Sequence, residues 1–184
     1  MKRIAAFLDF QGTVGGEGAD DIRSLELYDF SAEAIRLLND NHILVIGITN
    51  QSQIAKGKFT MEEYLQKLSR IEGELAKRGA HFDDVYCCPH SHQDHCSCKK
   101  PLRGMVDMAL DKFPIDISRS YVIGDMGMTD MVLANNVGAK SVLVLTGVGK
   151  ASLNEFRDTW QDIEPTHISE NLLEAAKWVV EDCA

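Results

Sequence analysis

Five short apolar runs, each followed by a segment with a different periodicity, constrain the fold of this chain more than any other feature. The runs cover residues 4–10, 43–49, 84–88, 120–125 and 141–147. Each has the length of a strand and is too uniformly apolar for a strand with one face in water, so we expect strands that are buried on both faces. Strands that alternate with helices form a parallel sheet covered on both sides. The sequence therefore predicts an α/β fold, a Rossmann-like three-layer sandwich around a central parallel sheet.

The segments between the runs have helical patterns, and the clearest covers residues 60–79. Thr60 and Glu63 have the spacing of a capping box, and Gly79 is a stop signal. One apolar face is expected here, made of Met61, Leu65, Leu68, Ile71 and Leu75. Further helices are predicted at residues 31–40, 103–113, 130–139 and 169–180.

The length of 184 residues fits one domain, and we expect residues 1–184 to form it without a separate cap domain. No repeat or low-complexity linker divides the chain. The glycine-rich stretch 12–21 follows the first strand and is either a simple connection or a flap over a site. The pattern leaves the role of residues 15–18 open, and it does not indicate an oligomeric state.

The charge balance excludes some classes of partner. A formal net charge of −9 argues against general nucleic-acid binding, which requires clustered Lys and Arg. A small phosphorylated substrate needs only a few local cations and remains compatible with this charge. The apolar runs are too short to span a membrane, and the one at the N-terminus is too short for a signal peptide. We therefore expect a cytoplasmic protein, no membrane partner and reduced cysteines.

Polar residues stand at the ends of three of the predicted strands. Asp9 ends the first, Thr49 and Asn50 end the second, and Asp125 ends the fourth. Ligands of open parallel sheets bind at this edge, outside the carboxyl ends of the strands. We therefore expect these four residues to lie close together in a site.

Phosphoryl transfer needs the residue types that the chain places there. A carboxylate can attack phosphorus and form an aspartyl-phosphate, which water then hydrolyses. The charge on the transferring group must be neutralised by a divalent cation, a fixed ammonium group and hydroxyl or amide donors. Asp9 can serve as the nucleophile, Lys100 as the cation and Thr49 as a hydroxyl donor. Asp125 and Asp130 form a second acidic cluster of the kind that Mg²⁺ prefers.

A cluster of cysteines predicts a metal site. Four of the five cysteines fall between residues 87 and 98. Cys88, His90, Cys96 and Cys98 form the pattern C-x-H-x5-C-x-C, a Cys₃His set suited to a closed, tetrahedral, structural Zn²⁺ site. Cys87 competes for the first position, but strand alternation places it on the opposite face. Zinc in this loop would fix the peptide that carries Lys99 and Lys100.

Taken together, "DFQGTV", "ITNQS", "KKP" and "VIGDMGMTD" resemble the four motifs of the haloacid dehalogenase superfamily of phosphatases. "TNQSQIAKGKFT" and "CPH…CSCKKP" further resemble its small capless members with a zinc loop, which are the heptose bisphosphate phosphatases and the histidinol-phosphatases. The resemblance covers nearly the whole chain and implies a hydrolase of phosphomonoesters that uses Mg²⁺ and Zn²⁺.

The same resemblance implies roles for individual residues. Asp9 is the nucleophile, and Mg²⁺ is held by Asp9, the backbone carbonyl of Gln11 and Asp125, with Asp130 as a supporting acid. Asp9, Gln11, Thr49 and Lys100 are the expected catalytic residues. Phosphate and substrate are expected to contact Thr49, Asn50, Gln51, Ser52, Lys99 and Lys100.

Gln11 departs from the resembled phosphatases, in which this position is an aspartate that protonates the leaving oxygen and later activates water. A glutamine amide can orient water but cannot exchange a proton at neutral pH. The first expectation is a slow phosphatase, with a good leaving group, Asp20, Asp21 or a water relay compensating for the missing acid. The alternatives are a phosphate-binding relative without efficient turnover and an inactive relative that binds a partner.

The substrate signals point in two directions. "GKFT" and "KPLRGM" look more like heptose phosphatases, whereas the five-residue gap between His90 and Cys96 looks more like histidinol-phosphatases. We expect a sugar phosphate, with a histidinol-phosphatase-like enzyme as the alternative.

Overall fold

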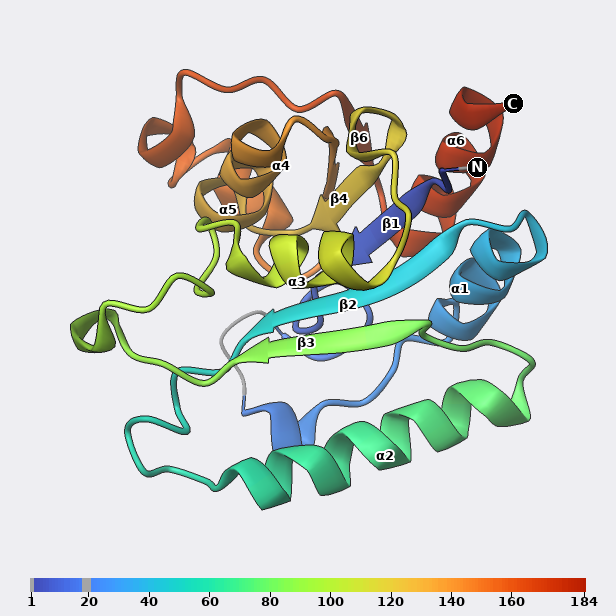
Figure 1. Ribbon diagram of the computed structural model, residues 1–184. Coiled ribbons are helices and arrows are strands. Elements are labelled where there is room, and N and C mark those ends of the chain that lie inside the picture. The colour runs from blue at the N-terminus through green and yellow to red at the C-terminus, as the bar shows by residue number, and fades with distance from the viewer. Residues whose placement is uncertain (1, 18–20) are drawn as a thin grey trace.

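A computed structural model describes residues 2–17 and 21–184 and shows one six-stranded sheet in the order β3-β2-β1-β4-β5-β6 (Figure 1). All neighbouring strands are parallel. The strands are β1 Ala5–Leu8, β2 Leu44–Asn50, β3 Asp84–Cys88, β4 Tyr121–Gly124, β5 Lys140–Val144 and β6 His167–Ser169. The chain moves outward in one direction from β1 to β3 and in the other from β4 to β6. The junction of β1 and β4 is therefore the topological switch point, where sheets of this kind bind ligands.

In the described residues, six α-helices alternate with the strands. They are α1 Ser31–Asp40, α2 Met61–Lys77, α3 Gly104–Lys112, α4 Val132–Val137, α5 Gly149–Leu153 and α6 Leu172–Cys183. The predicted capping box of α2 is confirmed, because Thr60 Oγ1 accepts from the Glu63 N–H and the Glu63 carboxylate accepts from the Thr60 N–H. The short edge strand β6 and the helix α5 were not predicted, since neither has a continuous apolar run or a clear periodicity.

Strands β1, β2, β4 and β5 are buried on both faces, as predicted, whereas β3, which was also expected to be buried, and β6 lie at the edges of the sheet and are only partly buried. Ala6 and Leu8 pack into a cluster that includes buried side chains of α1, α2 and α6. Ala5 and Phe7 point the other way, into a cluster with α3 and α4. Alternation along β1 thus supplies both interfaces, and the three-layer α/β sandwich is confirmed. Within the described part of the chain, no helix is both long and apolar enough to cross a membrane.

The apolar face expected on α2 was partly wrong. Ile71 and Leu75 are buried, but Met61 and Leu65 are 37% and 53% exposed, and Tyr64 is buried instead. At 3.6 residues per turn, Leu65 lies about 100° around the helix from Tyr64. The inward face of the helix is formed by Tyr64, Leu68, Ile71 and Leu75. Leu65 lies outside this face.

Candidate functional site

Two aspartates meet at the switch point of the sheet. Asp9 directly follows β1, and its N–H donates to the Ile123 carbonyl of β4 at 3.0 Å. Asp125 directly follows β4 and is buried. Two turns pass close to the carboxylate of Asp125, one at Gly12 and one at Gly147. Their φ angles are +83° and +54°. A Cβ atom at either glycine would collide with Asp125. Glycine is needed at both positions, for the backbone angle and for the space.

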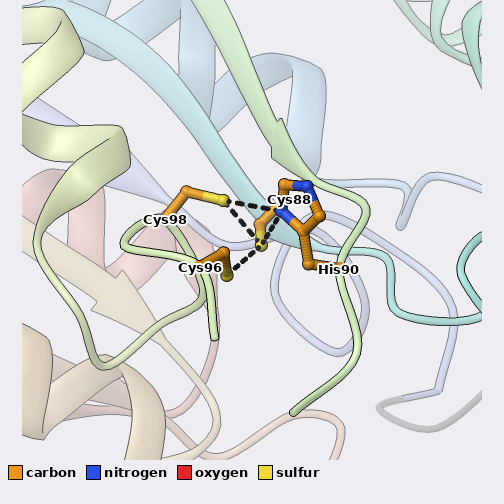
Figure 2. A group of neighbouring side chains, drawn as sticks. All are labelled: Cys88, His90, Cys96 and Cys98. Atoms are coloured by element: carbon orange, nitrogen blue, oxygen red, sulfur yellow. Dashed lines mark hydrogen bonds between the residues drawn. The ribbon is translucent and has the colours of Figure 1, made fainter. Parts of the chain in front are cut away.

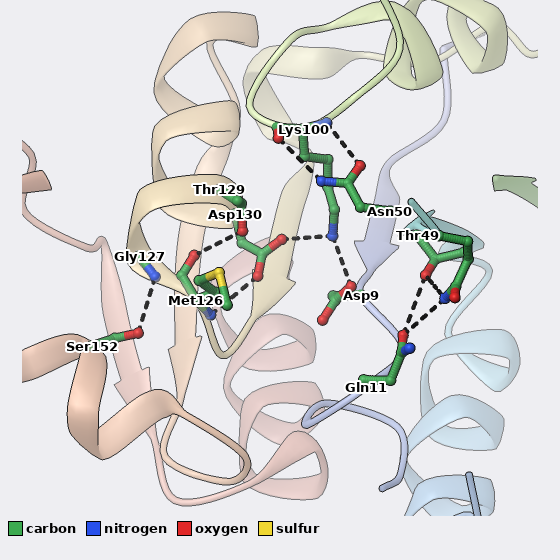
Figure 3. A network of polar contacts seen from close by, with 11 residues as sticks. Asp9, Gln11, Thr49, Asn50, Lys100, Met126, Gly127, Thr129, Asp130 and Ser152 are labelled. Carbon is green, nitrogen blue, oxygen red and sulfur yellow. Dashed lines mark hydrogen bonds and ion pairs between the residues drawn. The ribbon is translucent and has the colours of Figure 1, made fainter. Parts of the chain in front are cut away.

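Lys100 joins the acidic residues of the site (Figure 3). Its ammonium lies 2.7 Å from Asp9 Oδ1 and 2.8 Å from Asp130 Oδ1, and the side chain is only 3% exposed. Burial alone would lower the pKa of Lys100, but the carboxylates of Asp130 and Asp9 outweigh it and raise that pKa above its ordinary value. The site therefore holds a fixed positive charge directly beside Asp9.

The acidic cluster carries more negative charge than Lys100 can balance. Carboxylate oxygens of Asp9, Asp125 and Asp130 lie within 4.8 Å of one another. Burial, with added repulsion from Asp9 and Asp130, raises the pKa of Asp125 to about 8. Burial also raises the pKa of Asp130, to about 6, although Lys100 opposes the shift. Crowded, buried carboxylate oxygens of this kind are suited to a hard divalent cation such as Mg²⁺.

The segment after β5 holds Asp125 in place, and sequence analysis missed it. The Val148 N–H donates to Asp125 Oδ2 at 2.8 Å. Ser152 Oγ donates to the Asp125 carbonyl at 2.8 Å and accepts from the Gly127 N–H at 3.2 Å. Trp160 in turn donates from Nε1 to the Ser152 carbonyl at 2.9 Å. The available signal was the position of this segment directly after the fifth apolar run. Segments that follow the strands of a parallel sheet all lie at the same edge, so this one could have been expected beside Asp125.

The residues at the end of β2, and Gln51 directly after it, contact other site residues. The side-chain amide of Asn50 donates to the Lys100 carbonyl at 3.1 Å and accepts from the Lys100 N–H at 2.9 Å. The predicted contact of Asn50 with phosphate stays a prediction, and this pair of hydrogen bonds shows that Asn50 holds the backbone of Lys100. Thr49 and Gln51 are buried and contact the side chain of Gln11.

A pocket of about 140 Å³ opens beside the carboxylates. It is lined by Asp9, Gln11, Asn50, Lys100, Asp125, Met126 and Thr129. Thr49 and Gln51 do not line it, and their predicted contacts with phosphate stay predictions. Lys99 and Ser52 do not line it either. Lys99 Nζ donates to the His90 carbonyl at 3.4 Å and faces a neighbouring pocket on the zinc-loop side, while the Ser52 carbonyl accepts from the Lys56 N–H. The substrate-binding roles of both residues stay predictions.

Of the two acids considered as replacements at position 11, Asp20 lies outside the described residues. Asp21 caps the 3-10 turn Ile22–Ser24 and pairs with Arg23 at 2.7 Å. Arg23 also pairs with Glu63 of α2, at 3.0 Å. The carboxylate of Asp21 is therefore engaged in an ion pair that helps to attach this turn to α2.

Figure 2 shows that the predicted zinc ligands converge. The ligand atoms of Cys88, His90, Cys96 and Cys98 all lie within 4.8 Å of one another. Cys88 Sγ is 3.6 Å from Cys96 Sγ and 2.9 Å from Cys98 Sγ, and His90 turns Nδ1 toward the sulfurs. A tetrahedron with metal–sulfur bonds of about 2.3 Å has edges of about 3.8 Å. The donor set suits Zn²⁺ and the Cys88–Cys96 separation is close to such an edge, whereas Cys88 and Cys98 lie closer together than a bound ion would hold them. As predicted, Cys87 belongs to the opposite face of the sheet.

We predict that zinc stabilises this loop. Replacing Cys98 by serine should abolish stoichiometric zinc binding and lower the free energy of unfolding by about 3 kcal/mol or more, because bound metal stabilises the folded state by mass action. Metal analysis and thermal unfolding measure both effects. Cys183→Ser, which lies far along the chain in α6, is the matched control. Equal zinc content in the two variants would refute the assignment.

Comparisons with known proteins identify relatives of this chain. A family model described as HAD-hydrolase-like matches residues 97–175. The chain is 36% identical over 167 residues to the D-glycero-beta-D-manno-heptose-1,7-bisphosphate 7-phosphatase of Yersinia pestis, covering 85% of this chain and 88% of that protein. The corresponding Escherichia coli K12 protein is 37% identical over 154 residues, with 78% and 80% covered.

A solved structure is similar over the whole length. The D,D-heptose 1,7-bisphosphate phosphatase from B. bronchiseptica, determined with magnesium and phosphate, matches with a TM-score of 0.88 and 28% identity. The match covers 99% of each chain.

Proposed function

The chain belongs to the haloacid dehalogenase-like hydrolase family, among its phosphatases, and we propose that it removes a phosphoryl group from a small phosphorylated sugar of the heptose bisphosphate kind. The named relatives act on that substrate, and the motifs after β2 and after the zinc loop resemble theirs. The cytoplasmic location expected from the sequence is part of the same proposal.

One observation carries the proposal. Lys100, a buried ammonium, holds a carboxylate oxygen of Asp9 at the switch point of a parallel sheet, beside the carboxylate of Asp125. An aspartate alone at a strand end is common. An aspartate with a fixed cation on one side and two further acids within reach is the arrangement that phosphoryl transfer requires.

The reaction proceeds in two displacements at phosphorus, first of the ester oxygen by Asp9 and then of Asp9 by water, and the released oxygen takes its proton from solvent. A carboxylate oxygen of Asp9 forms a bond to phosphorus while the phosphorus–oxygen ester bond breaks, and the electron pair stays with the leaving oxygen. Water then attacks phosphorus, which releases inorganic phosphate and restores the carboxylate. The ammonium of Lys100 balances charge on the phosphoryl oxygens in both steps, and the Asn50 amide keeps the Lys100 backbone in position.

Asp9 and Asp125, with the backbone carbonyl of Gln11, would hold Mg²⁺. Bound there, the ion would neutralise charge on the transferring phosphoryl group. Two observations support this: the crowding of buried carboxylates at the site, and the magnesium present in the B. bronchiseptica structure.

Removal of Mg²⁺ should abolish activity without unfolding the protein. We expect chelated enzyme to lose turnover, and added Mg²⁺ to restore it while Ca²⁺ does not, because Ca²⁺ takes more ligands at longer distances. Initial rates and thermal unfolding should be measured on the same samples, with zinc content checked. Full activity in metal-free buffer would exclude the proposed magnesium site.

A screen identifies the substrate. Rates with Mg²⁺ should be compared over heptose and other sugar phosphates, histidinol phosphate and nucleotides. The proposal expects the highest kcat/KM for a sugar bisphosphate. A preference for histidinol phosphate would support the alternative that the short gap between His90 and Cys96 suggests.

The presence of Gln11 favours a second candidate, a phosphate-binding relative with little turnover. Phosphate binding without hydrolysis would indicate this second function.

A further inference from the structure

We propose that Thr146 is a positioning residue whose hydroxyl joins the turn after β1 to the segment after β5. This link keeps the backbone carbonyl of Gln11 and the carboxylate of Asp125 at a fixed relative position, as ligands of one divalent cation. The inference deepens the proposed function, because it rests on the magnesium site proposed above. Thr146 belongs to none of the four motifs quoted from the sequence.

The contact joins residues that are 134 positions apart. Thr146 lies two residues beyond the end of β5, and its Oγ1 donates to the Gly12 carbonyl at 2.6 Å. A carbonyl oxygen can only accept, so the direction of this hydrogen bond cannot be reversed. The distance is at the short end of the range for hydroxyl donors, and the pair is partly buried. Thr146 therefore restrains the turn that carries Gln11.

The turn itself directs the carbonyl of Gln11. The Gly12 N–H donates to the Gly15 carbonyl at 2.8 Å, so the N–H and the C=O of Gly12 are both hydrogen-bonded. The peptide group between Gln11 and Gly12 is planar and trans, and its C=O therefore points away from its N–H. The Gln11 carbonyl is thus turned away from Gly15. Gln11 lines the pocket together with Asp9 and Asp125.

The segment that holds the turn also holds Asp125. Val148, two residues after Thr146, donates from its N–H to Asp125 Oδ2 at 2.8 Å. Between them, Gly147 packs so closely that a Cβ atom there would lie 2.1 Å from Asp125 Oδ2 and 2.4 Å from Gly12 Cα. One short segment therefore contacts both Asp125 and the turn after β1.

Strand pairing alone does not fix this arrangement. The ladder between β1 and β4 ends at the pair Leu8 and Ile123, with one further bond from the Asp9 N–H to the Ile123 carbonyl. Gln11 and Asp125 lie beyond that end, so their separation depends on contacts outside the ladder. The segment after β5 provides such contacts to both sides.

Mg²⁺ makes this separation important, because it requires nearly ideal octahedral geometry with ligands at about 2.0–2.1 Å. Residues that orient metal ligands without binding the metal typically contribute about 10- to 100-fold to metal affinity. Loss of the Thr146 hydroxyl should remove a donor from the Gly12 carbonyl and let the turn move relative to Asp125. We therefore expect weaker Mg²⁺ binding, with the chemical step at saturating Mg²⁺ little changed.

The first test measures Mg²⁺ binding by titration calorimetry and needs no turnover. Thr146→Val keeps the shape of the side chain and removes the hydroxyl, so the dissociation constant for Mg²⁺ should rise about tenfold. Thr146→Ser retains the hydroxyl and should bind Mg²⁺ like the parent protein. Thr166→Val is the matched control, because that hydroxyl oxygen accepts from the Ser141 N–H at the beginning of β5, and it should leave Mg²⁺ affinity unchanged. Equal affinity in Thr146→Val and the parent protein would overturn the proposal.

The second test separates positioning from a general loss of stability. In metal-free protein, hydrogen exchange at the Gly12 N–H should become faster in Thr146→Val and not in Thr146→Ser. Zinc content should stay at the parent level, and the melting temperature should fall no further than in Thr166→Val. With p-nitrophenyl phosphate, Thr146→Val should need about tenfold more Mg²⁺ for the half-maximal rate and regain the parent kcat at saturation. A rate loss that persists at saturating Mg²⁺ would indicate a purely structural role.

Failure of the proposed function can be told apart from failure of this inference. If the parent protein binds Mg²⁺ and hydrolyses no phosphoester, the proposed function fails, and calorimetry still decides the role of Thr146. If the parent protein hydrolyses phosphoesters and Thr146→Val binds Mg²⁺ equally well, the inference alone fails. A parent protein that binds no Mg²⁺ would refute both.

Discussion

Replacing Asp9 by asparagine is expected to reduce kcat by at least about 10³-fold, the largest loss from any single change to this site. The asparagine amide has nearly the same shape, and its oxygen can still accept from Lys100. It lacks the carboxylate that attacks phosphorus and would contribute less to holding Mg²⁺. The substitution therefore removes the chemistry with little change in geometry.

Stability should not fall in this variant. Asp9 repels Asp125 and Asp130, and this repulsion contributes to the raised pKa values of both acids. Removing one of three crowded charges relieves that repulsion. Loss of turnover with an unchanged or raised melting temperature would separate a chemical defect from unfolding.

Two measurements complete the test. Acid-quenched enzyme should contain a phosphorylated peptide that includes Asp9 in the parent protein and not in Asp9→Asn. Asp111→Asn, an exposed position on α3, is the matched control and should retain full activity. If Asp9→Asn keeps more than a tenth of the parent rate, another group must be the nucleophile.

The second large effect is a gain. Gln11→Asp should raise kcat by about 10²–10⁴-fold on alkyl phosphates, because it supplies the general acid and base that the chain lacks. On p-nitrophenyl phosphate, whose leaving group needs little protonation, the gain in the phosphoryl-transfer step should be much smaller. The dependence of rate on leaving-group pKa should thus be steep in the parent protein and shallow in the variant.

Gln11→Asn is the matched control, since it has the length of aspartate and the chemistry of an amide. It should show no gain on either class of ester. The pH dependence of kcat/KM should acquire a new limb in Gln11→Asp alone, which reports ionisation of the introduced carboxyl group. If Gln11→Asp and Gln11→Asn have equal rates, either the acid comes from elsewhere or chemistry does not limit turnover.

Local pattern was sufficient to predict much of the fold. A buried parallel strand must be apolar on both faces, so the five apolar runs were visible as strands. Helix α1 and strand β3 have the predicted bounds. β6 was missed because an edge strand of three residues is not buried on both sides. Leu65 was placed on the wrong face of α2, since an apolar residue indicates the core only when the helix turns it inward.

The strand-end residues could be predicted as a group because the carboxyl ends of parallel strands share one edge of the sheet. Asp9, Thr49 and Asp125 are such residues, and the cysteine spacing predicted the metal cluster by the same kind of local rule. Asp9 and Asp125 lie together at that edge, whereas Thr49 is buried and does not line the pocket, and the roles assigned to all three stay predictions.

The sequence by itself determined which chemical groups reach the edge of the sheet: a carboxylate after the first strand, a lysine after a cysteine-rich loop, and an amide in the place of an acid. Only the tertiary structure decided how they pair. Asn50 holds the backbone of Lys100, and Thr146 holds the backbone of Gly12. These partners lie 50 or more positions apart. The direction of a hydrogen bond between such residues depends on strand order and register, which no local pattern encodes.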